Sequence, residues 1–483
     1  MFESEFLTSS AESKNCYREL ISQAAQLVCE CFPARAYSGA SVSDLAALIS
    51  GDFLPEHGLS PDQIPATFHS VISNSVAVSD VGTIAHLHCP PLLASLAAEV
   101  VISALNQSMD SFDQAPIATI VEQKLVNWLC AQAGLPAGAD GTFTAGGSQS
   151  NYMGLLLARD AFLKKQWNWS AQKRGLHPYS CRLRILCSEV AHFTVEKSAA
   201  QLGLGTDAVV RVAADDQFRM SFIALRKQID QLQAQNLFPM AIVATAGTTD
   251  FGSIDPIADI AEIARGVGAW LHVDAAYGGA LLFSPRQRGR LAGLESADSV
   301  SMDFHKLLWQ PIPCSGFLLA DAQQFDLIKM HADYLNPEAH EADGIPDLVT
   351  KSVLTSRRFD VLKLWISFQA LGREKLAQMI DRTISLANHA AEVIRRNPRL
   401  ELMCEPQLST VVFRVRAIRP DTDSDQLSAR IRQQLFHTGR AVIGHTRVRN
   451  HSCLKFTCMN PAADETDLGA LVEEIVQVSN TAT

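Results

Sequence analysis

Between about residues 143 and 320, short runs of aliphatic and β-branched residues alternate with longer stretches whose apolar residues recur at helical spacing. This alternation is typical of βαβ units, in which helices connect the parallel strands of one sheet. The pattern therefore predicts an α/β fold with a mostly parallel sheet. The predicted strands are residues 183–187, 208–212, 240–245, 270–273, 299–302 and 316–319.

The segments on either side of this region have different patterns. Helical spacing predicts helices at residues 16–28 and 91–105 before it, and at 256–265 within it, where Asp255 is expected to cap the helix. Long helices are predicted over 359–394. The tail from residue 401 mixes predicted strands with helices and suits a small α+β domain. Its predicted strands are 410–415 and 454–459, and its helices 424–438 and 465–478.

With 483 residues, the chain exceeds the length at which a single core usually stops growing. We expect an N-terminal helical segment over residues 1–109, a large domain over 110–370 and a small α+β domain over 371–483.

Composition argues against several classes of protein. A net charge of −10 disfavours a general nucleic-acid binder, which needs basic residues to neutralise phosphates. The first residues lack the pattern of a signal peptide, and the longest apolar segment is too short to cross a bilayer. The 11 cysteines include no CxxC pair, so we expect reduced thiols and no metal site. These features predict a cytoplasmic protein that binds neither membrane nor nucleic acid.

Two charged residues follow predicted strands and suggest a coenzyme. Asp274 ends one apolar run, and Lys306 follows another. Pyridoxal 5'-phosphate (PLP) chemistry needs such a pair, because a lysine amine holds the aldehyde carbon while a carboxylate keeps the ring nitrogen protonated. The small residues Ala275 and Ala276 would leave room for a flat ring. In isolation, the aspartate could instead form a turn and the lysine could be a surface charge.

A second feature suits the phosphate of that coenzyme. Gly147 and Ser148 lie just before an amphipathic stretch at residues 152–163, and a helix start offers free N–H groups to an anion. An ordinary capped turn is the alternative. The GxGxxA match at residues 203–208 precedes a predicted strand and does not open a helix, so a nicotinamide-dependent dehydrogenase is disfavoured.

Three further residues follow strands or lie in a long loop. His192 follows the strand at 183–187 and could stack on the coenzyme, while Thr245 ends a strand at the edge where parallel sheets bind ligands. Tyr334 lies near the start of an irregular stretch at 331–346. Loops of this length often act as lids, so this tyrosine is a candidate proton donor.

Taken together, these residues resemble the group II PLP-dependent amino-acid decarboxylases. The similarity lies in the order and spacing of Gly147-Ser148, His192, Thr245, Asp274, Lys306, Tyr334 and residues 357–365. Within that family, the chain looks most like the branch that acts on diamino acids, which includes lysine and 2,4-diaminobutyrate decarboxylases. The segments that carry this second resemblance are residues 85–91, 106–114, 331–337 and 454–461.

The resemblance implies a type I PLP-dependent transferase fold with a seven-stranded sheet in the large domain. It also implies a homodimer with shared active sites, in which the N-terminal segment packs across the dimer and the Tyr334 loop reaches the neighbouring site. The implied catalytic residues are Lys306, Tyr334, His192 and Asp274. The implied cofactor contacts are Gly147, Ser148, His192, Thr245, Asp274, Ala276, His305 and Lys306.

The expected reaction is PLP-dependent decarboxylation of lysine, ornithine or 2,4-diaminobutyrate to a diamine and carbon dioxide, for siderophore or polyamine biosynthesis. Candidate substrate contacts are His86, Asp110, Asp113 and Arg358, and either aspartate could pair with a distal ammonium or be a solvated loop charge. An aromatic or acidic amino-acid decarboxylase, an aminotransferase, an aldehyde-forming oxidative deaminase and a catalytically silent PLP-binding protein remain open alternatives.

Overall fold

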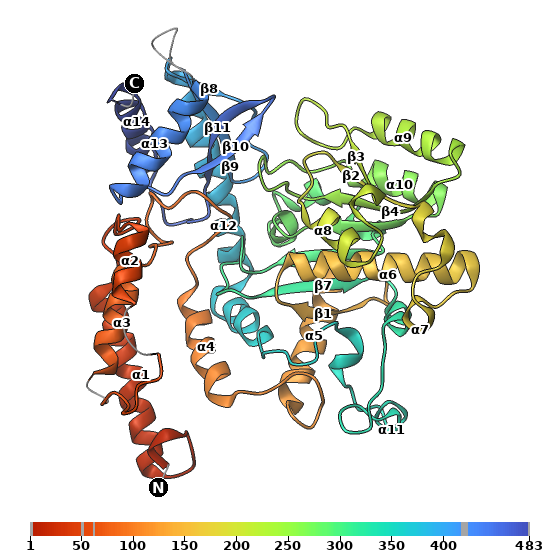
Figure 1. The fold of residues 1–483 in the computed structure, drawn as a ribbon, viewed down its shortest axis with the longest axis horizontal. Helices are drawn as coiled ribbons and strands as arrows, with labels where there is room; N and C mark the ends of the chain where they lie inside the picture. The colour runs from red at the N-terminus through yellow and green to blue at the C-terminus, as the bar shows by residue number, and fades with distance from the viewer. Residues whose placement is uncertain (1–2, 50–52, 61–62, 417–423, 482–483) are drawn as a thin grey trace. The chain divides into compact units, whose positions relative to one another are not determined.

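The computed structural model describes residues 3–49, 53–60, 63–416 and 424–481 (Figure 1). The α-helices are α1 Ala11–Cys31, α2 Val42–Leu48, α3 Ile64–Ser73, α4 Leu93–Leu105, α5 Pro116–Gln132, α6 Gly147–Trp167, α7 Ala171–Arg174, α8 Thr194–Gln201, α9 Phe222–Ala234, α10 Ile257–Val267, α11 Glu338–Ala342, α12 Val361–Arg396, α13 Ser424–His437 and α14 Glu465–Thr481. The strands are β1 Asp140–Thr144, β2 Leu183–Ser188, β3 Val209–Val212, β4 Phe238–Thr245, β5 Trp270–Asp274, β6 Ser299–Asp303, β7 Ser315–Leu319, β8 Leu400–Leu402, β9 Thr410–Val415, β10 Gly444–Val448 and β11 His451–Thr457.

The large sheet has seven strands in the order β1-β7-β6-β5-β4-β2-β3. Only β7 runs antiparallel to its neighbours, while β6, β5, β4, β2 and β3 pair in parallel. The predicted mostly parallel, seven-stranded sheet is therefore confirmed. All six predicted strands form, and the seventh, β1, was not predicted. Its sequence, DGTFT, has one large apolar residue, and pairing with β7 makes it a strand.

The register of the sheet aligns the carboxyl ends of three parallel strands. Thr245 at the end of β4 lies opposite Asp274 at the end of β5, and Asp274 lies opposite Ser301 near the end of β6. Asp303, the last residue of β6, lies opposite Ser315, the first residue of antiparallel β7. Five polar side chains thus come to one edge of the sheet, where α/β proteins bind their ligands.

Helix α6 contacts β4, β5, β6 and β7 and is long enough to cross much of the sheet (Figure 1). Its residues Leu155 and Leu163 belong to a buried apolar cluster with Ile185 of β2 and Val243 of β4. Gly154 lets the helix approach the imidazole of His272, because a Cβ at this position would lie 2.5 Å from His272 Nδ1.

Asp255 is not the cap of α10, so this prediction was wrong. The helix begins at Ile257 with Pro256 at its N-cap and has no side-chain cap. The buried carboxylate of Asp255 instead accepts hydrogen bonds from the backbone N–H groups of Met220, at 2.6 Å, and Thr245, at 2.8 Å. Asp255 therefore holds the end of β4, where two buried amides need an acceptor more than the exposed helix start does.

Most predicted helices form with shifted ends. The helix predicted at 16–28 is α1 and that at 91–105 is α4, and both carry exposed apolar side chains. Helix α12 contains a break at Gly372, where φ is 66°. The irregular stretch predicted at 331–346 contains the short helix α11.

The chain divides into two compact units. One contains residues 1–86, 389–403 and 411–483, and includes a four-stranded sheet in the order β10-β11-β9-β8. The other contains residues 87–388 and 404–410, with the seven-stranded sheet. The three domains expected from the sequence, with boundaries after residues 109 and 370, stay a prediction. In the part of the chain that the structure describes, no helix is both long and apolar enough to cross a membrane.

We predict that Gly154→Ala destabilises the protein, because the added methyl group must displace either α6 or the His272 ring in a close-packed interior. Overpacking of this kind costs about 1–3 kcal/mol. Urea unfolding monitored by circular dichroism measures the change. Gly266→Ala on α10 is the matched control, since an added Cβ meets nothing within 4 Å there. Replacing an exposed helical glycine should stabilise by about 0.5–1 kcal/mol. Equal midpoints for the two variants would contradict the close approach of α6.

Candidate active site

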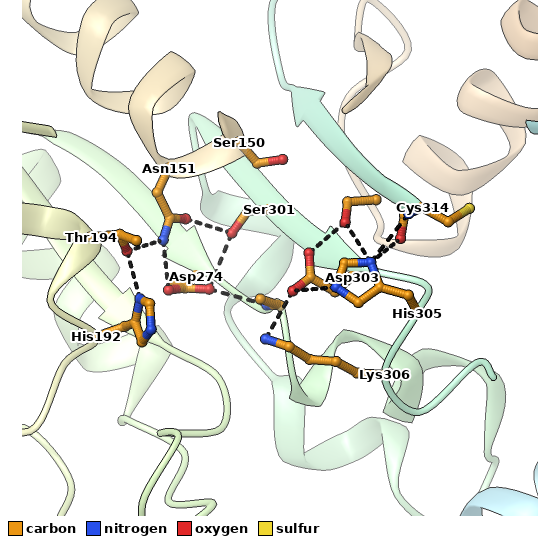
Figure 2. Close-up of polar contacts among 12 residues, drawn as sticks. Ser150, Asn151, His192, Thr194, Asp274, Ser301, Asp303, His305, Lys306 and Cys314 are labelled. Atoms are coloured by element: carbon orange, nitrogen blue, oxygen red, sulfur yellow. Dashed lines mark hydrogen bonds and ion pairs between the residues drawn. The ribbon is translucent and has the colours of Figure 1, made fainter. Parts of the chain in front are cut away.

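Lys306 and Asp303 form an ion pair just beyond the end of β6 (Figure 2). Lys306 Nζ lies 2.8 Å from Asp303 Oδ2, and its side chain is 18% exposed. The Ser315 hydroxyl donates to Asp303 Oδ1 at 2.6 Å, which fixes the carboxylate from the neighbouring strand β7. The lysine amine is therefore held in a largely enclosed position, but it is not completely buried.

The charges around Asp303 keep it ionised. Burial by itself would raise its pKa, but the charges of Lys306 and His305, with hydrogen bonds from Lys306 and Ser315, outweigh burial and hold the pKa below its ordinary value. His305 Nε2 lies 3.7 Å from Asp303 Oδ2, and its Nδ1 lies 2.9 Å from the carbonyl oxygen of Cys314. Asp303 thus acts as the counter-ion of the lysine.

Asp274 has a different environment, although it lies on the neighbouring strand. Its Oδ2 accepts a hydrogen bond from Asn151 Nδ2 at 2.8 Å, and its Oδ1 accepts from the Ala276 N–H at 3.1 Å (Figure 2). The Ser301 hydroxyl oxygen lies 3.2 Å from the same Oδ1. These donors are neutral, and within the described ranges of the chain no cationic side chain forms an ion pair with this buried carboxylate. A cationic N–H from a bound ring would supply the missing counter-charge.

His192 lies in the turn between β2 and α8. Its Nδ1 is 2.9 Å from the hydroxyl oxygen of Thr194. Burial lowers the pKa of His192 below its ordinary value; Asp274 acts in the opposite direction, and Lys306 reinforces the decrease. The imidazole is therefore within electrostatic reach of both Asp274 and Lys306, so the three side chains border one region (Figure 2).

The first turn of α6 faces the same edge of the sheet. A Cβ added to Gly147 would lie 3.1 Å from the Cβ of Ala276 and 3.2 Å from Asp303 Oδ2, so the helix start packs closely against both residues. Ser148 is exposed in the same turn. The first N–H groups of a helix have no partner within the helix, and together with the helix dipole they attract an anion such as phosphate.

Thr245 has a buried hydroxyl that a polar ligand could satisfy. This hydroxyl has no hydrogen-bond partner among the residues that the structure describes, whereas the backbone N–H of Thr245 donates to Asp255. A buried hydroxyl without a partner is costly, and this one lies in register with Asp274. The residues present therefore fit PLP: a lysine amine, a carboxylate that lacks a cation, an unsatisfied hydroxyl and a helix start for the phosphate.

The structure brings together Gly147, Ser148, His192, Thr245, Asp274, Ala276, His305 and Lys306, as described above. Tyr334 is not among them, since it lies on the loop before α11 with 88% of its surface exposed. That loop is held by its own contacts, including one from Asn336 Nδ2 to the Met330 carbonyl oxygen at 2.8 Å.

The four candidate substrate contacts have other partners. Buried Asp110 accepts the Ser111 N–H at 2.9 Å, and exposed Asp113 accepts the Ser111 hydroxyl at 2.6 Å. Arg358 pairs with Glu99 at 2.5 Å and with Asp360 at 3.3 Å. His86 belongs to the other compact unit. Their roles toward a substrate stay predictions.

Sequence reasoning missed the residues that support the two carboxylates. Asp303 precedes Lys306 by three positions, and this i,i+3 spacing could have suggested the ion pair. Asn151 lies three positions after Ser148, which was assigned to the phosphate. Nothing in the sequence pattern singles out Ser301, Thr194 or His272, because their proximity depends on strand register.

Comparisons with known proteins identify the family to which the chain belongs. Residues 50–416 match the family model described as the pyridoxal-dependent decarboxylase conserved domain. The chain is 40% identical over 450 residues to an L-2,4-diaminobutyrate decarboxylase of Acinetobacter baumannii, with 91% of this chain and 88% of the relative covered. It is 41% identical over 461 residues to the protein of that name from Rhizobium meliloti, with 95% and 90% covered.

A solved structure shows the same fold. It is the glutamate decarboxylase domain of a diaminobutyrate-pyruvate transaminase and L-2,4-diaminobutyrate decarboxylase from Vibrio parahaemolyticus, with a TM-score of 0.91, 38% identity and 99% of each chain covered. Family, fold and site geometry agree. The chain belongs to the pyridoxal-dependent decarboxylase family and is a PLP-dependent amino-acid decarboxylase.

Proposed function

We propose that this enzyme decarboxylates L-2,4-diaminobutyrate to propane-1,3-diamine and carbon dioxide, in the cytoplasm, for siderophore or polyamine biosynthesis. The observation that supports the substrate is the 40–41% identity, over more than 90% of the chain, to two proteins that carry this activity in their names. Lysine and ornithine are the nearest alternatives because they differ only in the length of the chain that bears the distal ammonium.

The residues of the site have distinct proposed roles. Lys306 would hold the aldehyde carbon of the coenzyme, and Asp303, which pairs with the Lys306 amine, would keep that amine at the site when a substrate is bound. Asp274 holds the proton on the ring nitrogen, and His192 packs against the ring. Gly147 and Ser148 bind the phosphate, with Thr245, Ala276 and His305 completing the cofactor contacts. PLP, when bound, accepts the electrons left when carbon dioxide departs.

Tyr334 is the proposed donor of the proton to the substrate α-carbon, and it acts from a second subunit. The tyrosine is almost fully exposed and lies outside the Lys306 region within its own chain, so a single chain leaves the site without this donor. Exposed apolar side chains on α1 and α4, including Leu20, Ile21 and Leu93, support a homodimer, since such surfaces mark interfaces. The N-terminal segment is proposed to pack across that dimer.

His86, Asp110, Asp113 and Arg358 remain the proposed substrate contacts. The segment with the two aspartates is anchored to the residues that follow the Tyr334 loop, because Phe112 N–H donates to Asp347 at 2.8 Å and Val349 N–H donates to the Asp110 carbonyl oxygen at 3.1 Å. This anchoring supports a carboxylate beside the loop as the partner of the distal ammonium.

A substrate panel tests the reaction and its specificity. With PLP present, carbon dioxide release should be fastest for L-2,4-diaminobutyrate, with the amine as the coproduct. L-ornithine, L-lysine, L-glutamate and aromatic amino acids should be slower. A preference for glutamate or aromatic substrates would overturn the diamino-acid assignment, while a keto acid or aldehyde as the main product would overturn simple decarboxylation.

Thr245→Val should weaken PLP binding without destabilising the cofactor-free protein. Removing one hydrogen bond to the cofactor should raise its dissociation constant about fivefold, whereas an apolar isostere at an unsatisfied buried hydroxyl removes a desolvation cost. Thr248→Val is the matched control, because buried Thr248 bonds to the Ser253 hydroxyl at 2.7 Å. It should lose stability and keep PLP affinity. Fluorescence titration and urea unfolding measure both quantities, and the reverse pattern would contradict the cofactor contact.

Mixed dimers test the shared site. Lys306→Ala and Tyr334→Phe should each abolish amine formation alone. After co-expression, random pairing in a twofold dimer should restore about a quarter of wild-type activity, because half of the dimers contain one intact site. No recovery from isolated mixed dimers would show that each site takes both residues from one chain.

A further inference from the structure

Asn151, in the first turn of α6, connects the two groups proposed to hold the coenzyme ring. Its side chain is 2% exposed and makes four hydrogen bonds. Nδ2 donates to Asp274 Oδ2 at 2.8 Å and to Thr194 Oγ1 at 3.0 Å, and Oδ1 accepts from the Ser301 hydroxyl at 2.8 Å (Figure 2). Oδ1 also lies 3.0 Å from His272 Nε2. All its donor and acceptor positions are therefore used.

The carboxylate of Asp274 fixes the orientation of this amide. With the amide reversed, Oδ1 would face Asp274 Oδ2 at 2.8 Å, and two acceptor oxygens without a proton between them repel each other. The observed orientation requires that His272 carries its proton on Nε2. His272 Nδ1 then accepts from the Ser299 hydroxyl at 2.8 Å, and Ser299 accepts from Trp270 Nε1 at 2.8 Å.

The two N–H groups of Asn151 lead to two branches of hydrogen bonds, one to Asp274 and one through Thr194 to His192. Thr194 Oγ1 accepts the second N–H, which leaves the proton of Thr194 free to point at His192 Nδ1, 2.9 Å away. With the Thr194 proton on this contact, His192 Nδ1 is the acceptor, and the neutral ring carries its proton on Nε2. Burial, which lowers the pKa of His192, favours the same neutral ring. In histidine, the hydrogen bond at one nitrogen decides which nitrogen carries the proton.

We propose that Asn151 is a positioning residue that links Asp274 and His192 through the two N–H groups of its amide. These contacts hold the Asp274 carboxylate in place for a ring N–H and, through Thr194, fix His192 as its neutral Nε2–H tautomer. The inference rests on the proposed roles of Asp274 and His192 toward the coenzyme. Asn151 itself acts only through these two residues.

The two branches can be separated by substitution. Asn151→Leu keeps a similar volume and removes both branches, whereas Thr194→Val removes only the branch to His192. His272→Gln is the matched control, because glutamine can still donate an N–H to Asn151 Oδ1 and should leave both branches intact.

The tautomer is read from ¹⁵N chemical shifts of the histidine side chains in the holoenzyme labelled with ¹⁵N-histidine, with His192 assigned by its loss in His192→Gln. In the wild type and in His272→Gln, His192 should show one protonated Nε2 and one unprotonated Nδ1. In Thr194→Val and Asn151→Leu, the two nitrogens should move toward averaged shifts. Unchanged His192 shifts in both variants would overturn the proposal.

The Asp274 branch is read from coenzyme binding. Asn151→Leu should bind PLP about tenfold more weakly, since a hydrogen bond to a charged group is lost. Thr194→Val should stay within about twofold of the wild type. Equal affinities for all variants would contradict the role toward Asp274.

If Asn151→Leu does not fold, the His192 shifts and the PLP affinity of Thr194→Val still decide the His192 branch. A wild type that decarboxylates none of the amino acids would end the proposed function but would leave the tautomer result intact.

Discussion

The register of parallel strands β4, β5 and β6 is the constraint on which the site depends. Because Thr245, Asp274 and Ser301 lie opposite one another, a hydroxyl, a carboxylate and a second hydroxyl reach the same edge of the sheet. A slip of one residue in any strand would turn its side chain to the other face. Two residues stabilise this alignment. Asp255 accepts the backbone N–H of Thr245 at the end of β4, and Gly154 lets α6 pack closely against His272 of β5.

Asp303 and Asp274, both at this edge of the sheet, have different functions because their surroundings differ. Asp303 faces a lysine and a histidine, which together hold its pKa below the ordinary value despite burial. Asp274 faces neutral donors only, so its charge is available to a ligand. One carboxylate thus serves the reactive amine, and the other serves the coenzyme ring. If both carboxylates formed ion pairs with cationic side chains of the protein, neither would be available to bind a pyridinium.

The sequence predicted much of this arrangement. Apolar runs located six strands of the large sheet, and small residues beside Asp274 indicated a flat ligand. The positions of Asp274 and Lys306 after predicted strands suggested the coenzyme, and the resemblance to a family added the order of the other residues. β1 escaped prediction because it has only one large apolar residue and forms a strand by pairing with β7. Asp255 was misassigned as a cap because local pattern cannot reveal two buried amides from distant segments. Asn151, Thr194 and His272 escaped because hydrogen-bond networks depend on register and on helix position, which no periodicity encodes.

The most direct test of the account is to locate the coenzyme on the chain. The purified holoenzyme is reduced with borohydride, which makes the link between PLP and its lysine permanent, and is then digested and mapped by mass spectrometry. The account predicts that the added coenzyme mass falls on the peptide with Lys306. Labelling of a different lysine, with Lys306 unmodified in a fully active preparation, would contradict it.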